Sequence, residues 1–188
     1  MGHEAVLSPL LHIELLGDQA PKNHFSVLVV TSGNAIAALL ENRFATKLKQ
    51  HPLFVVGAAT AKFAEDSGFE NIVIVAQNAN DLANSLIGWL KNEDGNQRVL
   101  YARGENFSFD MSVALADHGH VCDEWVIYRA READSFTPDT IQQLANGTVD
   151  AALLYSARSA RIFAQQLKEI CPKLDLWPAL SAISAKTR

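Results

Sequence analysis

Short apolar runs that alternate with segments of helical period constrain the fold of this chain most strongly. Residues 25–30, 53–56 and 150–155 are short, largely apolar runs of the kind that form buried strands. Amphipathic segments with helical spacing follow them, for example residues 35–44 and 157–170. Because strands that alternate with helices favour a parallel sheet wrapped by helices, the sequence predicts the α/β class.

The remaining elements are read from the same pattern and from capping residues. Further strands are expected at residues 71–76, 98–103 and 121–129. One further helix is expected to follow residues 57–60 and to end near residue 67, and another to run from an N-cap at Asp81 to residue 90. Two more are expected at residues 110–117 and from Pro138 onward, the latter with Thr137 or Asp139 as its cap.

Composition and charge exclude several functions. The net charge of −5 argues against broad nucleic-acid binding, although a local arginine cluster can still hold a small anion. No apolar run reaches the roughly 18 residues that cross a bilayer, and the N-terminus lacks a signal-peptide pattern. Cys122 and Cys171 form no ligand motif. Together these features predict a cytoplasmic protein that binds no membrane.

An internal repeat indicates two related halves. Residues 28–39 and 153–163 both read as strand, serine and helix, and residues 54–61 resemble residues 182–188. The first half lacks a strand–helix unit that the second has in front, and the second lacks a helix and strand that the first has behind. We therefore expect two similar α/β halves, truncated at both ends, with a coincidental likeness of βα units as the alternative.

Small and hydroxyl residues follow several of the expected strands. In parallel α/β sheets, ligands bind at the carboxyl ends of the strands, and helix N-termini there favour carboxylates or phosphates. A ligand with many acidic groups would suit such an edge. The alternative is that these residues are ordinary helix caps. The residues concerned are Thr31, Ser32, Gly57, Thr60, Gly104, Ser156 and Thr187.

Arginines and one tyrosine also lie at the ends of expected strands or at the starts of expected helices. Arg103 ends an expected strand, and Arg158 and Arg161 lie early in a helix, where a cation suggests a bound anion. Solvated surface arginines are the alternative. Tyr128 ends an extended stretch between the two halves, where its phenol can donate a proton or pack at a strand end.

No metal or nucleotide motif emerges. His118, His120 and Cys122 alternate on one stretch, but they give three ligands at best. The chain contains no GxGxxG, GxxxxGK[ST] or GxSxG sequence. We therefore expect neither a metal site nor a dinucleotide, P-loop or hydrolase site.

An ordered set of short motifs resembles the uroporphyrinogen-III synthase family over essentially the whole chain. The motifs are GHEAVLSPL (residues 2–10), VTSGNA (30–35), VGAATA (56–61), LYARGE (100–105), VIY (126–128) and YSARSA (155–160). The resemblance implies two flavodoxin-like domains around an active-site cleft. One domain covers residues 18–124, the other is built from residues 1–8 and 132–188 and is incomplete, and residues 9–17 and 125–131 form linker strands.

The resemblance also implies a reaction without a cofactor. Hydroxymethylbilane would lose its terminal hydroxyl, close through a spiro intermediate, and give uroporphyrinogen III with ring D inverted. Tyr128 matches the tyrosine that assists departure of water. The implied substrate-binding residues are Thr31, Ser32, Thr60, Arg103, Gly104, Ser156 and Thr187.

The same resemblance implies a cytoplasmic monomer of heme biosynthesis that receives its substrate from hydroxymethylbilane synthase. Family members carry further elements at both ends, so we expect this chain to be weakly stable or inactive. One alternative is a non-catalytic, synthase-like domain that binds a tetrapyrrole or another small polyanion. A two-lobed receptor for a different small anion is a third reading.

Overall fold

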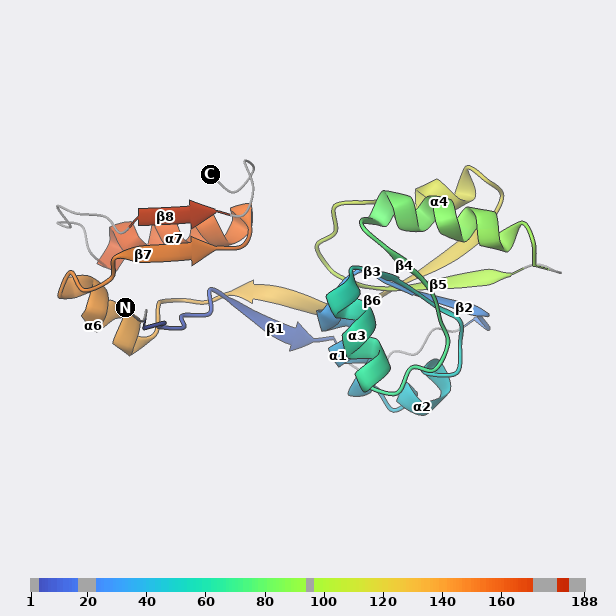
Figure 1. Ribbon diagram of the computed structural model, residues 1–188, viewed down its shortest axis with the longest axis horizontal. Coiled ribbons are helices and arrows are strands. Elements are labelled where there is room, and N and C mark those ends of the chain that lie inside the picture. The colour runs from blue at the N-terminus through green and yellow to red at the C-terminus, as the bar shows by residue number, and fades with distance from the viewer. Residues whose placement is uncertain (1–3, 17–22, 94–96, 171–178, 183–188) are drawn as a thin grey trace. The chain divides into compact units, whose positions relative to one another are not determined.

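The computed structural model describes residues 4–16, 23–93, 97–170 and 179–182, which form an α/β fold (Figure 1). The chain divides into two compact units. Unit 1 consists of Met1–His12 with Arg131–Arg188, and unit 2 consists of Ile13–Ala130.

The elements alternate along the chain largely as expected. The strands are β1 (Leu11–Leu15), β2 (Val27–Val30), β3 (Leu53–Val56), β4 (Ile72–Ala76), β5 (Arg98–Gly104), β6 (Val121–Glu132), β7 (Ala151–Leu154) and β8 (Ala179–Ala182). The helices are α1 (Gly33–Leu40), α2 (Ala45–Leu48), α3 (Ala58–Asp66), α4 (Ala79–Leu90), α5 (Met111–Ala116), α6 (Pro138–Ala145) and α7 (Ala157–Ile170).

Six strands form one mostly parallel sheet in the order β1-β6-β5-β2-β3-β4. The pairs β5–β6, β2–β5, β2–β3 and β3–β4 are parallel. β1 runs antiparallel to β6, because the Leu16 amide donates to the Ile127 carbonyl while the Ala133 amide donates to the Leu10 carbonyl. β1 and β6 also contain the two points at which the chain passes between the units.

Helices cover both faces of the sheet in unit 2. Figure 1 shows α4 on one face and α1 and α3 on the other. Leu28 and Val30 of β2 pack into the core under α1, whereas Val27 and Val29 pack into the core under α4. Because successive strand residues point to opposite faces, this two-sided cover explains why all four residues of β2 are buried.

The sheet changes its winding direction between β2 and β5. The helices that follow β2 and β3 lie on one face, and the helices that follow β4 and β5 lie on the other. The helices that follow the neighbouring strands β2 and β5 therefore lie on opposite faces, so the carboxyl ends of these two strands form a topological switch point. The α/β class is confirmed. The parallel order β6-β5-β2-β3-β4 puts the first parallel strand in the centre, unlike the flavodoxin order.

Unit 1 has a smaller sheet, in which β7 pairs in parallel with β8. Leu154 of β7 is buried in a core with Phe163 and Leu167 of α7 and Leu144 of α6. The preceding Leu153 points the other way and is 65% exposed. In the part of unit 1 that the structure describes, helices therefore cover one face of β7.

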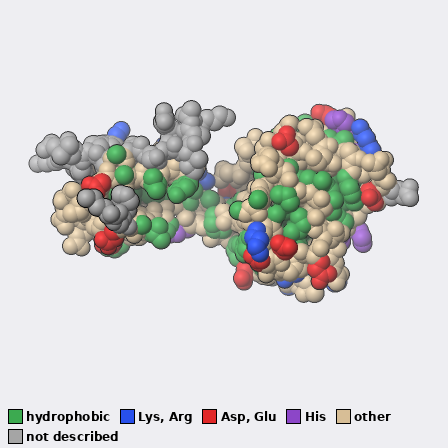
Figure 2. Space-filling model, viewed as in Figure 1, with side chains coloured by type: hydrophobic (Ala, Val, Ile, Leu, Met, Phe, Trp, Pro, Cys, Tyr) green, Lys and Arg blue, Asp and Glu red, His purple; other side chains and the backbone are tan. Residues whose placement is uncertain are grey.

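Unit 2 has an apolar surface patch between α3 and α4 (Figure 2). Figure 2 shows hydrophobic side chains gathered between α3 and α4, where β4 forms the edge of the sheet. The exposed side chains of Phe63 in α3 and Val75 in β4 belong to these two elements. Among the residues that the structure describes, no helix combines the length and the apolar character needed to cross a membrane.

Candidate functional site

The carboxyl ends of β2 and β5 place predicted site residues at this switch point. Thr31 and Ser32 directly follow β2, and Arg103 and Gly104 end β5. Val30 lies opposite Ala102 in the β2–β5 ladder, so both strands reach the same edge. Parallel sheets bind ligands at such a switch point.

Ser32 connects this edge to Tyr128. Its side chain caps α1 by accepting a hydrogen bond from the Ala35 amide. The Ser32 hydroxyl and the Tyr128 hydroxyl also share a hydrogen bond of 2.9 Å. The predicted catalytic phenol therefore lies at the N-terminus of a helix, where unpaired amides favour negative charge.

An irregularity in β6 turns Tyr128 toward α1. Arg103 pairs with Val126 and Gly104 pairs with Tyr128, so β6 contains one extra residue, Ile127. Ile127 and Tyr128 both pack against the core under α1, although consecutive strand residues normally face opposite sides. A β-bulge re-aims side chains in this way.

Gly104 makes room for the tyrosine ring. A Cβ at this position would lie 2.6 Å from Cζ of Tyr128 and 2.8 Å from its hydroxyl oxygen. Such distances are far below the normal contact of roughly 3.5 Å between carbon atoms. Gly104, predicted as a substrate-binding residue, therefore has a steric role beside Tyr128 in this structure.

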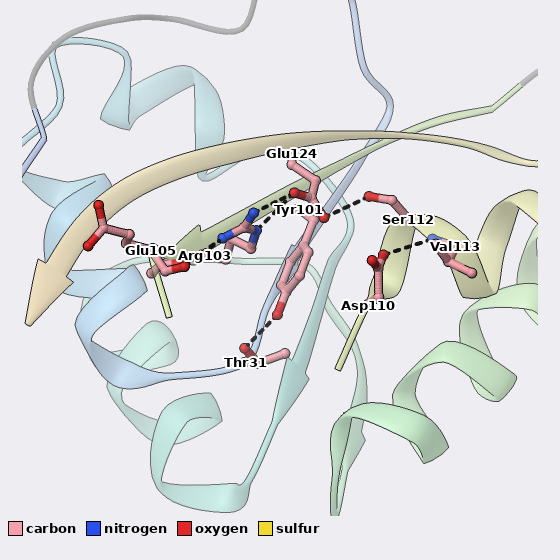
Figure 3. Close-up of polar contacts among 9 residues, drawn as sticks. Thr31, Tyr101, Arg103, Glu105, Asp110, Ser112, Val113 and Glu124 are labelled. Atoms are coloured by element: carbon pink, nitrogen blue, oxygen red, sulfur yellow. Dashed lines mark hydrogen bonds and ion pairs between the residues drawn. The ribbon is translucent and has the colours of Figure 1, made fainter. Parts of the chain in front are cut away.

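The neighbouring Thr31 contacts a second tyrosine. Its hydroxyl shares a hydrogen bond of 3.1 Å with the hydroxyl of Tyr101 (Figure 3). Tyr101 is only 2% exposed, and burial raises the pKa of its phenol. Tyr101 therefore remains protonated at neutral pH and holds the Thr31 hydroxyl in a fixed place.

Arg103 lies in a dense polar cluster (Figure 3). Its Nε and Nη2 donate to the Glu124 carboxylate at 3.0 and 2.6 Å, and its Nη1 donates to the carbonyls of Gly104 and Glu105. The guanidinium also lies 4.0 Å from the ring centre of Phe107. The predicted contact between Arg103 and a substrate would require these bonds to be exchanged.

Thr60 reaches the same sheet edge through the next strand. It lies in the first turn of α3, which follows β3 and the N-cap Gly57. Gly57 has a φ of 84°, a conformation that favours glycine. A Cβ there would lie 4.0 Å from the Thr60 hydroxyl, so the two residues are close neighbours.

The remaining predicted residues belong to unit 1. Ser156 caps α7, with its hydroxyl accepting from the Ser159 amide at 3.0 Å. Thr187 lies outside the described residues. Glu132 pairs with both Arg158 and Arg161, so a carboxylate of the chain itself is the anion beside these arginines. Arg129, similarly, makes a two-point contact with Glu14.

Within the described ranges, no group of three or more histidine, cysteine or acidic side chains could hold a metal ion. Burial raises the pKa of the Cys122 thiol to about 12. The thiol is therefore protonated near neutral pH and is a poor ligand or nucleophile.

The sequence reasoning missed two residues of this region. Tyr101 and Glu124 hold Thr31 and Arg103, respectively. Tyr101 stands two positions before Arg103, so period-two alternation places both on one face of β5. The pairing of Glu124 depends on the β5–β6 register, for which the sequence carries no signal.

Comparison with known proteins assigns the family. The model of the family "Uroporphyrinogen-III synthase HemD" matches residues 1–188, the whole chain. The chain belongs to the uroporphyrinogen-III synthase HemD family. No curated protein sequence matches it significantly.

Solved structures support the fold. The uroporphyrinogen-III synthetase from Helicobacter pylori 26695 aligns with a TM-score of 0.68 and 18% identity, over 95% of this chain and 77% of that one. A mutant uroporphyrinogen III synthase from Thermus thermophilus aligns with a TM-score of 0.51 and 17% identity, over 95% and 75% of the two chains. At these identities the likeness is one of fold.

Proposed function

We propose that this member of the HemD family is a uroporphyrinogen-III synthase. It would convert hydroxymethylbilane to uroporphyrinogen III, with inversion of ring D and loss of water, as a cytoplasmic monomer in heme biosynthesis. The observation that carries the proposal is the Tyr128 hydroxyl, 2.9 Å from the Ser32 hydroxyl at the switch point of the sheet. Family membership supplies the substrate class.

Tyr128 has the chemistry that departure of water needs. The substrate hydroxyl must leave with an added proton, and a phenol positioned by a hydrogen bond is a general acid. Ser32 can accept from or donate to the phenol, so it can fix the direction of the Tyr128 O–H group.

The helix ends around Tyr128 suit a substrate with many carboxylates. The first turns of α1 and α3 carry no acidic residue, whereas the first turn of α4 carries Asp81. Amides at the N-termini of α1 and α3 therefore meet no competing carboxylate of their own helix. Arg103 is set apart from the predicted binding residues, because its donors are engaged by Glu124 and by two backbone carbonyls. The proposed binding residues are Thr31, Ser32, Thr60, Gly104, Ser156 and Thr187.

We propose the division into two domains and a linker that the sequence predicts. Residues 18–124 would form one domain, residues 1–8 with 132–188 the other, and residues 9–17 and 125–131 the linker. Hydroxymethylbilane synthase would supply the unstable substrate. Sedimentation of the purified chain alone and with that enzyme tests the monomer and the handover.

The deciding experiment is incubation with freshly generated hydroxymethylbilane, followed by oxidation and chromatographic separation of the uroporphyrin isomers. Type III isomer in excess of the spontaneous type I product would support the proposal, and it would contradict the expectation from the sequence that this chain is weakly stable or inactive. Type I product alone, together with tetrapyrrole binding, would instead favour a binding domain without turnover.

A tyrosine pair gives the matched control. Tyr128→Phe should lower kcat by about 10²-fold, which is within the range of general acid catalysis. Tyr155→Phe removes a hydroxyl from a tyrosine that is 72% exposed and should leave kcat unchanged. Equal rates for the two variants would remove Tyr128 from the proposed chemistry.

A further inference from the structure

The extra residue in β6 sets the direction of Tyr128. Ile127 interrupts the parallel ladder between the pairs Arg103–Val126 and Gly104–Tyr128. The ladder resumes at once, because the Glu105 amide donates to the Tyr128 carbonyl at 2.9 Å. Bulges in parallel pairs are rare, so interactions around this one must hold it.

Arg103 bridges the two sides of the bulge. Its Nη1 donates to the Gly104 carbonyl at 2.8 Å and to the Glu105 carbonyl at 3.2 Å. Its Nε and Nη2 donate to Glu124, which lies on β6 before the extra residue. The guanidinium thus ties the end of β5 to β6 across the irregular step.

Glu124 is held in turn by a third element. Its second carboxylate oxygen accepts a hydrogen bond of 2.8 Å from the Ser112 hydroxyl in α5 (Figure 3). Both carboxylate oxygens are therefore engaged, and the planar fork of Arg103 has a fixed partner.

We propose that Arg103 and Glu124 are positioning residues that hold the β5–β6 bulge and thereby direct the Tyr128 hydroxyl at Ser32. Arg103 would then act on the substrate only through Gly104, Glu105 and Tyr128, not by binding a substrate carboxylate. The kinetic part of this inference rests on the proposed synthase activity, whereas the structural part does not.

Burial supports a positioning role over a binding role. The Arg103 side chain is 11% exposed. A substrate carboxylate that took its donors would leave Glu124 and two backbone carbonyls without them, and unsatisfied polar groups of this kind are unfavourable.

The same two strands supply a matched control. Arg98 at the start of β5 pairs with Asp123 on β6, with Nε 2.6 Å from the carboxylate. This pair joins the same strands with the same kinds of charged group, but Arg98 lies at the start of β5, away from the bulge, and Asp123 directly precedes Glu124 on β6. Arg103→Lys and Glu124→Gln can therefore be compared with Arg98→Lys and Asp123→Asn.

Fluorine NMR reads the position of Tyr128 without any substrate. The chain has three tyrosines, so uniform 3-fluorotyrosine labelling gives three signals that Tyr→Phe variants assign. Arg103→Lys and Glu124→Gln should shift and broaden the signal of residue 128, and the two control variants should leave it in place. An unmoved signal, or an equal movement in both pairs, would overturn the inference.

Steady-state kinetics separates positioning from binding. Arg103→Lys and Glu124→Gln should each lower kcat by about tenfold or more, since small misplacements near the chemistry are costly, while KM stays near that of the parent. A raised KM with unchanged kcat in Arg103→Lys would instead make Arg103 a substrate ligand and overturn the proposal. If the parent enzyme forms no type III isomer, the proposed function fails, and the NMR result alone decides the positioning role.

Discussion

Two strand–serine–helix junctions, one in each unit, share their local geometry and differ in their surroundings. Ser32 follows β2 and caps α1, and Ser156 follows β7 and caps α7. The Ser32 hydroxyl also bonds to Tyr128 from a distant strand, whereas the Ser156 hydroxyl bonds to Ser159 within its own cap. The short sequence pattern therefore determines the cap, and the sheet determines what else the hydroxyl contacts.

The sheets around these junctions explain the difference. β2 lies between β3 and β5 and is buried on both faces. β7 pairs with β8, and its exposed residues alternate with partly or fully buried ones. The residues that follow a central strand have neighbouring strands on both sides. The hydrogen bond between Ser32 and Tyr128 forms at such a position.

The largest expected effect comes from truncating one buried leucine in each strand. Leu28→Ala should cost about 3–5 kcal/mol, because Leu28 is fully buried between β3 and β5, and Leu154→Ala about 2–3 kcal/mol. Denaturant unfolding, with hydrogen exchange to locate the loss, measures both. Equal losses would contradict the distinction between a two-sided and a one-sided environment.

Gly104→Ala should have the next largest effect. The new methyl group would overlap the Tyr128 ring, so we expect a loss of about 1–3 kcal/mol from overpacking and a fall in kcat of about 10²-fold. Isomer analysis and denaturant unfolding check the two effects.

Gly88→Ala is the control for that change. Gly88 lies within α4, and a Cβ there would have no heavy atom within 4 Å. Alanine should stabilise this helix by about 0.5–1 kcal/mol. A Gly104→Ala variant that behaves like Gly88→Ala would show that Tyr128 can move away without cost.

The serine pair tests the comparison directly. Ser32→Ala and Ser156→Ala should each lose about 1 kcal/mol, since each removes a helix cap. Only Ser32→Ala should show coupling with Tyr128→Phe, of about 0.5–1.5 kcal/mol in a double-mutant cycle, because the two hydroxyls share a hydrogen bond. Additive losses for Ser32 and Tyr128 would mean that this bond contributes nothing.

Local patterns predicted much of the fold. The strand at residues 53–56 has the expected bounds, and α7 covers residues 157–170 as expected. The predicted N-cap at Asp81 is wrong. Asn78 caps α4 by accepting from the Asp81 amide, and Asp81 lies in the first turn, because both residues suit a helix start. The short helix α2 was not predicted, since four residues carry too little periodicity.

The contacts of the candidate site depend on pairing between residues that are distant in the sequence, and these could not be predicted. The sequence places Ser32, Gly104 and Tyr128 at strand ends, but it does not reveal the strand order that joins them or the extra residue that turns Tyr128. The arginines show the same limit. Arg103 and Arg161 were read as sites for an anion, and their carboxylate partners lie 21 and 29 residues away in the sequence. Charge alone does not tell an internal partner from a ligand.

These two arginine–glutamate clusters provide the last and smallest prediction. Glu132→Gln in unit 1 removes the charge that faces Arg158 and Arg161, and the Arg161 side chain is 58% exposed. Exposed ion pairs contribute about 0.2–1 kcal/mol and are screened by salt, so the loss should be small and should nearly vanish in about 1 M salt. Glu124→Gln in unit 2 should cost more and should depend less on salt, because its partner Arg103 is largely buried. Denaturant unfolding of both variants at low and high salt measures this difference. A larger or salt-independent loss for Glu132→Gln would mean that the arginines at the start of α7 depend on their internal carboxylate as strongly as Arg103 does.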